Sequence, residues 1–243
     1  NPLAAMIQNA SVMKNRLGQL NMAANLQAAE RIGINMADIR RYMEERSIFT
    51  MIDAVTEAGS RVSGIVNNML SFARRKETRA SGHDLALLVD KTLELAATDY
   101  NLKKQYDFKI IKIEKEYADG LPMVACEGSE IQQVLLNIFL NGAQAMQDDR
   151  RNRDYTPCFK LRLGQDNDPS MVNTQIRDNG PGMDKEIVKR VFEPFFTTKP
   201  SGVGTGLGLS VSYFIITQNH GGTMDVESEP GRGTNFTIRL PIA

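Results

Sequence analysis

The sequence predicts an α+β fold in which a helical hairpin is followed by an α/β layer. Apolar residues recur at steps of three and four in the amino-terminal third, whereas later segments alternate apolar and polar residues between helical runs. A charged and then small-residue stretch, from Arg74 to Gly82, interrupts both patterns and indicates a linker. We therefore expect two domains, residues 1–80 and residues 81–243.

The amino-terminal domain carries two apolar seams whose spacing, near 3.5 residues, is typical of helices that pack side by side. The first seam comprises Leu3, Met6, Ala10, Met13, Leu17 and Leu20, and the second comprises Ile48, Ile52, Val55, Gly59, Val62, Val66, Met69 and Ala73. A lone hairpin leaves part of both seams in water, so we expect a homodimer whose hairpins form a four-helix bundle. Charged and small residues fill the connection, residues 21–46, where we predict short helices.

Composition argues against several classes of function. Lys+Arg and Asp+Glu each count 29, so no net charge draws the chain to nucleic acid or to an anionic membrane. Cys126 and Cys158 lack metal or redox spacing, and His83 and His220 stand alone, so we expect no transition-metal centre and two ordinary packed or surface histidines. No apolar run is long enough to span a membrane, so we expect no membrane contact within this segment.

In the carboxy-terminal domain, a helical stretch from His83 to about Lys104 precedes strands and further helices. The strand candidates of period two contain Phe159/Leu161/Leu163, Val172/Thr174/Ile176 and Phe236/Ile238/Leu240, and helical runs are predicted at about 129–147 and 206–219. Amphipathic strands between helices predict a sheet with one covered face and one solvated face.

The helix expected at 129–147 has an unusual polar face. A turn of about 100° per residue places Glu130, Gln133, Asn137, Asn141 and Gln144 in one stripe, opposite Ile131, Leu135, Ile138 and Met146. A solvated surface would explain the stripe, but two Asn one turn apart are poor helix formers and favour a functional role. Carboxamide oxygens are suitable ligands for Mg²⁺ that also binds phosphates, which indicates a nucleotide site.

Two glycine-containing segments support the same interpretation. Asp178 to Met183 (DNGPGM) follows a strand and could place a carboxylate beside a flat ligand, although Asp-Asn-Gly is also an ordinary turn. Alternating glycines from Gly202 to Gly208 lead into an apolar helical run and could face phosphates. Lys199 precedes these glycines and could reach a phosphate, or be an exposed loop residue.

The order of these features resembles that of sensor histidine kinases. Residues 130–146 (EIQQVLLNIFLNGAQAM) resemble the N box, Asp178–Met183 the G1 box, Val191–Lys199 (VFEPFFTTK) the F box, Gly202–Gly208 the G2 box and Gly231–Thr234 the last glycine motif. At the amino end, Asn1-Pro2-Leu3 resembles the end of the H box, His-Glu-x-x-Asn-Pro-Leu. The acceptor histidine of that motif precedes this Asn by four positions, so we expect a chain truncated just after it.

The resemblance implies the GHKL (Bergerat) two-layer α/β sandwich with an ATP site. It implies Asn141 and Asn137 as Mg²⁺ ligands, with Asn137 also orienting phosphate as a catalytic residue, and Asp178 as acceptor for the adenine amine. The ATP-binding residues that it implies are Asn137, Asn141, Gln144, Ala145, Asp178, Gly180, Gly182, Met183, Lys199, Gly204, Thr205, Gly206, Leu207, Gly208 and Thr234. Burial of Phe192, Phe195 and Phe196 would anchor the loop that covers the phosphates.

The implied reaction transfers the γ-phosphoryl group to a histidine absent from this chain, and then to an aspartate of a response-regulator receiver domain. Asn1 matches a position proposed to orient water when such kinases dephosphorylate their partner. We expect this segment to bind ATP without autophosphorylating. We also expect a cytoplasmic location, with any membrane anchor elsewhere in the full-length protein.

Two alternative functions stay open. A GHKL ATPase that drives a conformational cycle needs a carboxylate to activate water. In such relatives it lies four residues before the Mg²⁺-binding Asn, where this chain has Asn137, and Glu130 lies about two turns too early. The second alternative is a nucleotide-binding signalling dimer without catalysis, but the intact motifs argue against a degenerate site.

Overall fold

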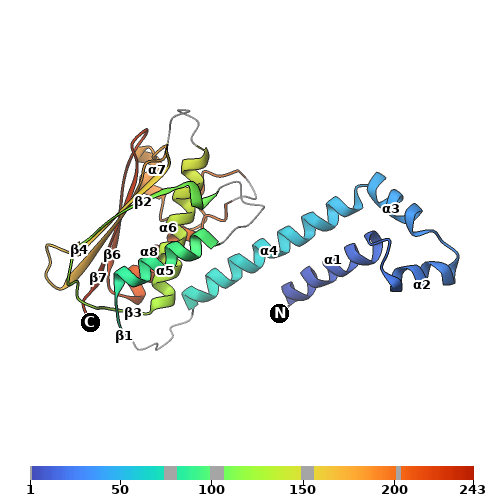
Figure 1. Cartoon of the computed structure of the whole chain (residues 1–243), viewed down its shortest axis with the longest axis horizontal. Helices are drawn as coiled ribbons and strands as arrows, with labels where there is room; N and C mark the ends of the chain where they lie inside the picture. Colours follow the sequence, from blue (N-terminus) through green and yellow to red (C-terminus); the bar gives the residue numbers. More distant parts are fainter. Residues whose placement is uncertain (1, 74–80, 99–106, 149–155, 201–203) are drawn as a thin grey trace. The chain divides into compact units, whose positions relative to one another are not determined.

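The structure, a computed structural model, resolves into two compact units, Asn1–Ser71 and Phe72–Ala243, each described here by itself (Figure 1). The described residues are 2–73, 81–98, 107–148, 156–200 and 204–243. No helix within these ranges is both long and apolar enough to cross a membrane.

The first unit is built on two antiparallel helices, α1 (Pro2–Gly18) and α4 (Ile48–Ala73). Lys14 of α1 forms a salt bridge of 2.6 Å with Asp53 of α4. Near the end of α1, a Cβ on Gly18 would lie 3.2 Å from the Phe49 ring. These contacts confirm the predicted hairpin.

Two short helices, α2 (Ala23–Ile32) and α3 (Met36–Glu45), occupy the connection as expected. Asn25 ties α2 to the end of α1, because its side-chain amide donates to the carbonyls of Asn15 and Gln19 at 3.2 and 2.9 Å. Asn35 caps α3 by accepting a hydrogen bond of 2.8 Å from the Ala37 N–H. A side-chain cap therefore defines the start of α3, whereas α2 is held to the end of α1 by Asn25.

Both predicted seams leave apolar side chains in solvent within one copy of the unit. Ala10 is 1% exposed, whereas four other seam residues are 45% to 58% exposed, namely Met6, Met13, Val55 and Val62. The side chains of Val66, Met69 and Ala73 lie outside the described residues. The exposed seam residues present an apolar surface that a single hairpin does not cover.

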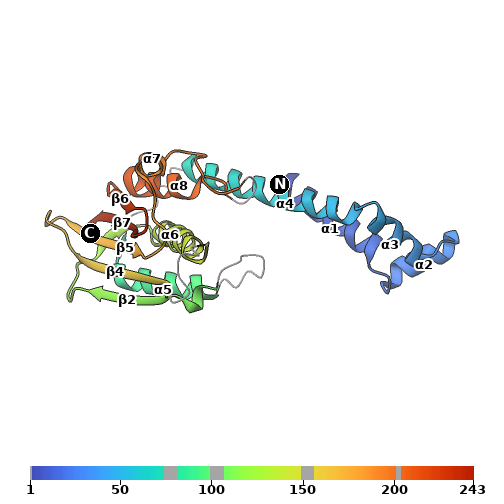
Figure 2. The ribbon, with the colours of Figure 1, turned by 90° about the horizontal axis from the view of Figure 1, so that it is seen from above.

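The second unit is a two-layer α/β sandwich. Its sheet has the order β2-β4-β5-β7-β6, with β2 parallel to β4 and the other neighbours antiparallel. The strands are β1 (Ser81–His83), β2 (Lys112–Tyr117), β3 (Val124–Cys126), β4 (Cys158–Gln165), β5 (Met171–Asp178), β6 (Thr223–Glu229) and β7 (Gly233–Pro241). The helices are α5 (Leu85–Thr98), η1 (Phe108–Ile110), α6 (Gly128–Asp148), α7 (Lys185–Arg190), α8 (Gly208–Phe214) and η2 (Ile215–Asn219). Helices α5, α6 and α8 cover one face of the sheet, which confirms the predicted layers (Figure 2).

The strands alternate between the two faces as predicted. Phe159, Leu161 and Leu163 of β4 are at most 3% exposed under the helices. Phe159 packs edge-on against Phe139 of α6, with ring centroids 5.5 Å apart. On the other face Lys160 pairs with Glu116 of β2 at 2.6 Å. One face of the sheet is therefore core, and the other is polar and solvated.

Two predicted helices are present but differ in their details, and three strands were not predicted. The helix predicted from His83 begins instead at Leu85. His83 pairs with Val124 in a short strand, and Asp84 caps the helix by accepting a hydrogen bond from the Leu87 N–H. Residues 99–104, where the helix was predicted to end, lie outside the described residues. The helix predicted at 206–219 divides into α8 and a π-helical turn, η2. Strands β2, β3 and β6 were not predicted, and β2 and β3 pair with strands that are distant in the sequence.

Candidate functional site

Helix α6 presents the predicted polar stripe beside its buried face. Ile131, Leu135, Ile138 and Met146 are at most 2% exposed, whereas Asn137, Asn141 and Gln144 are half-buried. Glu127 caps the helix by accepting a hydrogen bond of 2.8 Å from the Glu130 N–H. Burial of one face thus fixes the rotation of α6 and directs its carboxamides away from the core.

The Asp178 carboxylate lies at the end of β5, where it is buried. Its Oδ1 accepts hydrogen bonds from the backbone N–H groups of Gly180, at 2.9 Å, and Thr234, at 3.2 Å. Burial raises the pKa of Asp178 to about 6, although these two bonds and the charge of Arg177 lower it. The fold therefore holds a desolvated acceptor, and a ligand that donates hydrogen bonds would favour its charged form.

This raised pKa predicts a distinctive dependence of stability on pH. The folded state keeps the Asp178 proton up to about pH 6, whereas an unfolded Asp releases it near pH 4. The folded state thus binds more protons in this window, and the free energy of unfolding falls as pH rises through it. Asp178→Asn has no such proton, so at pH 7.5 the variant should be more stable than wild type by about 3 kcal/mol. Chemical denaturation without nucleotide should show this difference vanish near pH 4; an unchanged difference across the window contradicts the assignment.

Glycines surround the carboxylate closely. A Cβ on Gly142 of α6 would lie 2.7 Å from the Phe159 ring and 3.5 Å from Asp178 Oδ2. On Gly180 it would lie 2.9 Å from Asp178 Oδ1. These positions leave no room for a side chain, so α6 and the G1 segment approach Asp178 through backbone alone.

Met183 and Thr234 come together through Ser228 of β6, a residue that the sequence analysis missed. The Ser228 hydroxyl accepts a 2.8 Å bond from the Met183 N–H, donates to the Gly233 carbonyl at 2.9 Å, and lies 3.0 Å from Thr234 Oγ1. Ser228 thus joins the G1 segment to the last glycine motif. No local pattern marks it, because β6 itself was not predicted.

Lys199 contacts the polar stripe directly. Its ammonium donates to Asn141 Oδ1 at 3.0 Å and to Gln144 Oε1 at 2.7 Å. Asn137 instead donates to the Gly208 carbonyl and to Ser212 Oγ, both at 3.2 Å. The structure therefore brings Asn141, Gln144 and Lys199 to one point and joins Asn137 to the start of α8.

The remaining candidates lie along the segment that leads into α8. Thr205 Oγ1 accepts a 3.4 Å bond from the Leu207 N–H, and Leu207 is 1% exposed. Gly206, at φ +65°, packs against the Phe195 backbone, and Gly204 against Thr197 and Lys199. Ala145 is half-buried on α6. Asn1 and Gly202 lie outside the described residues.

The expectation that three phenylalanines are buried was wrong, because Phe195 is 60% exposed and Phe192 and Phe196 are only half-buried. A Cβ on Gly206 would lie 2.4 Å from the Phe195 carbonyl carbon, so the backbone there is close-packed, and at φ +65° the Phe195 ring extends into solvent. Phe192 packs on Tyr213 with centroids 4.9 Å apart, and Phe196 lies under the Arg190 guanidinium at 4.3 Å. Two of the three rings thus contact the rest of the domain.

Both histidines are packed, as expected. His220 is 9% exposed; its Nδ1–H donates to the Ile215 carbonyl at 2.9 Å and its Nε2 accepts from the Glu127 N–H at 3.0 Å. These two hydrogen bonds fix the orientation of the ring. His83 Nδ1 lies 2.9 Å from the Ser81 carbonyl. Among the described residues no three His, Cys, Asp or Glu side chains are placed to hold a metal ion.

Glu130 does not provide a water-activating base at the stripe. Both carboxylate oxygens accept hydrogen bonds from the Asn219 amide, at 3.2 and 3.0 Å, next to His220. The position one turn before Asn141 is Asn137, an amide that cannot take a proton at neutral pH. The position at which the hydrolytic alternative expects a carboxylate is therefore an amide.

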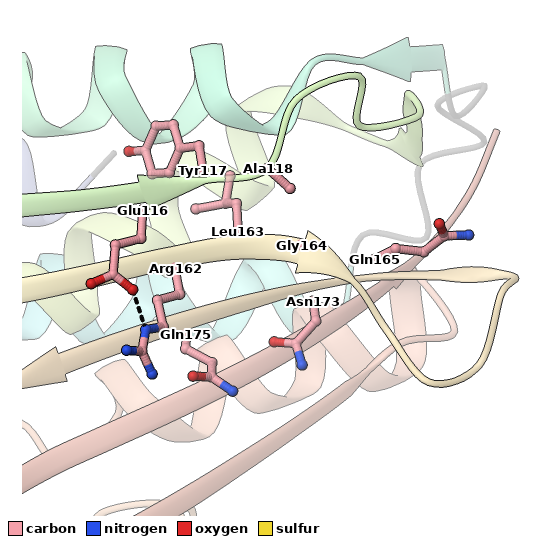
Figure 3. A pocket seen from close by; sticks show the side chains of 9 residues that line it. All are labelled: Glu116, Tyr117, Ala118, Arg162, Leu163, Gly164, Gln165, Asn173 and Gln175. Carbon is pink, nitrogen blue, oxygen red and sulfur yellow. Dashed lines mark hydrogen bonds and ion pairs between the residues drawn. The ribbon is translucent and has the colours of Figure 1, made fainter.

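A hollow of about 520 Å³ lies elsewhere, on the solvated face of the sheet (Figure 3). Side chains of β2, β4 and β5 line it, including Glu116, Arg162, Asn173 and Gln175, and Arg162 pairs with Glu116. None of the predicted site residues lines it, so this hollow and the Asp178 site are distinct.

Comparisons with known proteins agree with these features. Residues 126–243 match the family model described as histidine kinase-, DNA gyrase B-, and HSP90-like ATPase. Sporulation kinase E of Bacillus subtilis is 31% identical over 190 residues, which cover 78% of this chain and 23% of that protein. The catalytic domain of histidine kinase ThkA is 26% identical at a TM-score of 0.53, covering 68% of this chain and 97% of that one. Full-length ShkA, solved with AMPPNP, matches the fold over 100% of this chain and 43% of its own, at 23% identity and a TM-score of 0.66.

The sandwich and its glycine-flanked Asp178 therefore define an ATP-binding domain of the GHKL class. The chain belongs to the sensor histidine kinase family. It spans between 20% and 41% of the lengths of four curated relatives that it matches.

Proposed function

We propose that this chain is the ATP-binding core of a histidine kinase and that it binds Mg²⁺-ATP between α6 and the carboxyl end of β5. The observation that carries the proposal is the buried Asp178 carboxylate, flanked by Gly142 and Gly180 where no Cβ fits. Asp178 would accept a hydrogen bond from the adenine amine, and the glycines would admit the ring. Met183 and Thr234, joined through Ser228, would line the same pocket.

The carboxamide stripe fits a magnesium ion. Asn141 Oδ1 and Gln144 Oε1 already converge on one cation, the Lys199 ammonium, so both oxygens face a common point. Hard, uncharged oxygens suit a metal that also has phosphate ligands. Asn141 would hold the ion, which neutralises phosphate charge. Asn137 is better placed to orient the start of α8 than to be a second ligand.

The proposed reaction is transfer of the γ-phosphoryl group to an imidazole nitrogen and onward to a response-regulator aspartate. Positioning and charge neutralisation would supply most of the rate enhancement. Lys199 and the backbone of Gly204–Gly208 would contact the phosphates. This chain would contribute the nucleotide-binding part of this chemistry.

We propose a homodimer through α1 and α4, because their seams expose apolar side chains, Met6, Met13 and Val55 among them. Pairing two hairpins would cover this surface. A receiver domain is the second proposed partner. It is supported by the fold shared with ThkA, which has been solved in complex with the response regulator TrrA.

A labelling experiment tests the catalytic proposal. The chain contains only His83 and His220, and both are hydrogen-bonded inside the ATPase unit, so the chain should bind Mg²⁺-ATP without labelling itself. Extending it by His-Glu-x-x, which places a histidine four positions before Asn1, should produce an acid-labile phosphoryl label from γ-labelled ATP.

The matched control is the same extension with Gln in place of His, which should stay unlabelled. Gel filtration and a nucleotide titration would establish that both extended chains are dimeric and bind ATP. If they are, and the His extension still acquires no label, the kinase proposal is wrong.

A further inference from the structure

The ammonium group of Lys199 contacts Asn141 Oδ1, which is the oxygen atom proposed to bind the metal ion. It contacts two carboxamide oxygens one turn apart on α6, Asn141 Oδ1 at 3.0 Å and Gln144 Oε1 at 2.7 Å. All three residues are half-buried, which strengthens such contacts relative to a fully exposed pair. Lys199 is 55 residues from Gln144 in the sequence, so the fold, not local geometry, makes this site.

The chemistry of the three groups is that of a cation bound by neutral oxygens. Both amide groups direct oxygen, not nitrogen, at the ammonium. These oxygens carry no formal charge, so they bind the ammonium without neutralising it. A neutral acceptor also lacks the charge–charge attraction that a carboxylate would add to the contact.

We propose that Lys199 is the resident cation of this oxygen pair in the nucleotide-free protein and that Gln144 is the positioning residue that keeps it there. Lys199 must leave Asn141 Oδ1 before that oxygen can bind a metal. This inference rests on the proposed binding of Mg²⁺-nucleotide, and it gives Gln144 a role opposite to that of a nucleotide contact. Gln144 holds Lys199 in place and so weakens binding of the metal complex.

A double-mutant cycle measures this role through affinity for a fluorescent ATP analogue with Mg²⁺. Gln144→Leu removes one of the two oxygens that hold Lys199 and leaves Asn141 in place. It should therefore bind the analogue about three- to tenfold more tightly than wild type, the range expected for losing one hydrogen bond to a partly exposed charge. In a Lys199→Met background, Gln144→Leu should change the affinity by less than about twofold.

Gln147→Leu is the matched control, because Gln147 is an exposed residue of the same helix, and its affinity should equal that of wild type. Weaker or unchanged binding by Gln144→Leu overturns the inference. So does an equal gain in the Lys199→Met background.

A second measurement needs no nucleotide and separates failure of the inference from failure of the proposed function. The Lys199 N–H donates to Thr197 Oγ1 at 3.1 Å, so its hydrogen exchange reports on the anchored segment. Exchange at residues 197–199 should be faster in Gln144→Leu and Lys199→Met than in Gln147→Leu. Equal exchange rates overturn the inference even if wild type binds ATP. Absence of any nucleotide binding, with the exchange difference present, overturns the proposed function alone.

Discussion

Asp178→Asn should weaken binding of ATP by about 10- to 100-fold, the loss expected for a hydrogen bond to a charged acceptor. Asn can keep an oxygen on the Gly180 and Thr234 N–H groups, which engage Oδ1 in the wild type. Its amide nitrogen would then take the place of Oδ2. Two hydrogen-bond donors, the new side-chain amide group of the variant and the adenine amine, would therefore face each other. Calorimetric titration with ATP measures the loss.

The control is Asp225→Asn, which removes a carboxylate from the solvated face, where Asp225 pairs with Arg239. Its affinity for ATP should match that of wild type. Because the Asp178 variant is expected to be the more stable protein at neutral pH, weaker binding cannot be attributed to unfolding. Equal affinity of wild type and Asp178→Asn would remove the adenine role from Asp178.

Gly233→Ala should have the largest effect on the fold around the site. Gly233 has φ +83°, and a Cβ there would lie 2.0 Å from the Asp178 carbonyl oxygen. The methyl group therefore forces Asp178 and its bond to the Thr234 N–H to move. We expect a loss of roughly 3 kcal/mol or more, from left-handed strain and overpacking together. This corresponds to about 6 to 12 °C in the unfolding midpoint, with binding of ATP lost as well.

Gly120→Ala measures the cost of the left-handed backbone strain without a steric clash of the added methyl group. Gly120 has a similar backbone angle, φ +67°, but nothing lies within 4 Å of its Cβ position. This variant should lose only about 1 kcal/mol and bind ATP normally. If Gly233→Ala behaves like Gly120→Ala in a thermal melt and in a titration, close packing beneath Asp178 is not required for the site.

Features with a strong local pattern could be predicted from the sequence. The buried and polar faces of α6 followed from helical periodicity, and β4, β5 and β7 from alternation. Asn141, Asp178 and Lys199 were identified as candidates because their motifs stand in family order. Lys199 contacts α6 in the structure, whereas the sequence analysis expected it to contact a phosphate.

Features that depend on distant pairing could not be predicted. Strand β2 carries mostly charged residues and is recognisable only through its pairing with β4. Ser228 has no signal of its own, since its three partners come from other segments. Phe195 is exposed and has a left-handed backbone at φ +65°, and no spacing in the F box encodes either feature.

The most direct test of the proposed site is an NMR titration of the amide groups with AMPPNP and Mg²⁺. We expect the largest shifts at Asn141 to Gln144, at Asp178 to Met183 and at Gly233 and Thr234. Residues of the hollow on the opposite face, such as Arg162 and Gln175, should change little. Shifts concentrated at that hollow, or none at Asp178, would contradict the proposed site.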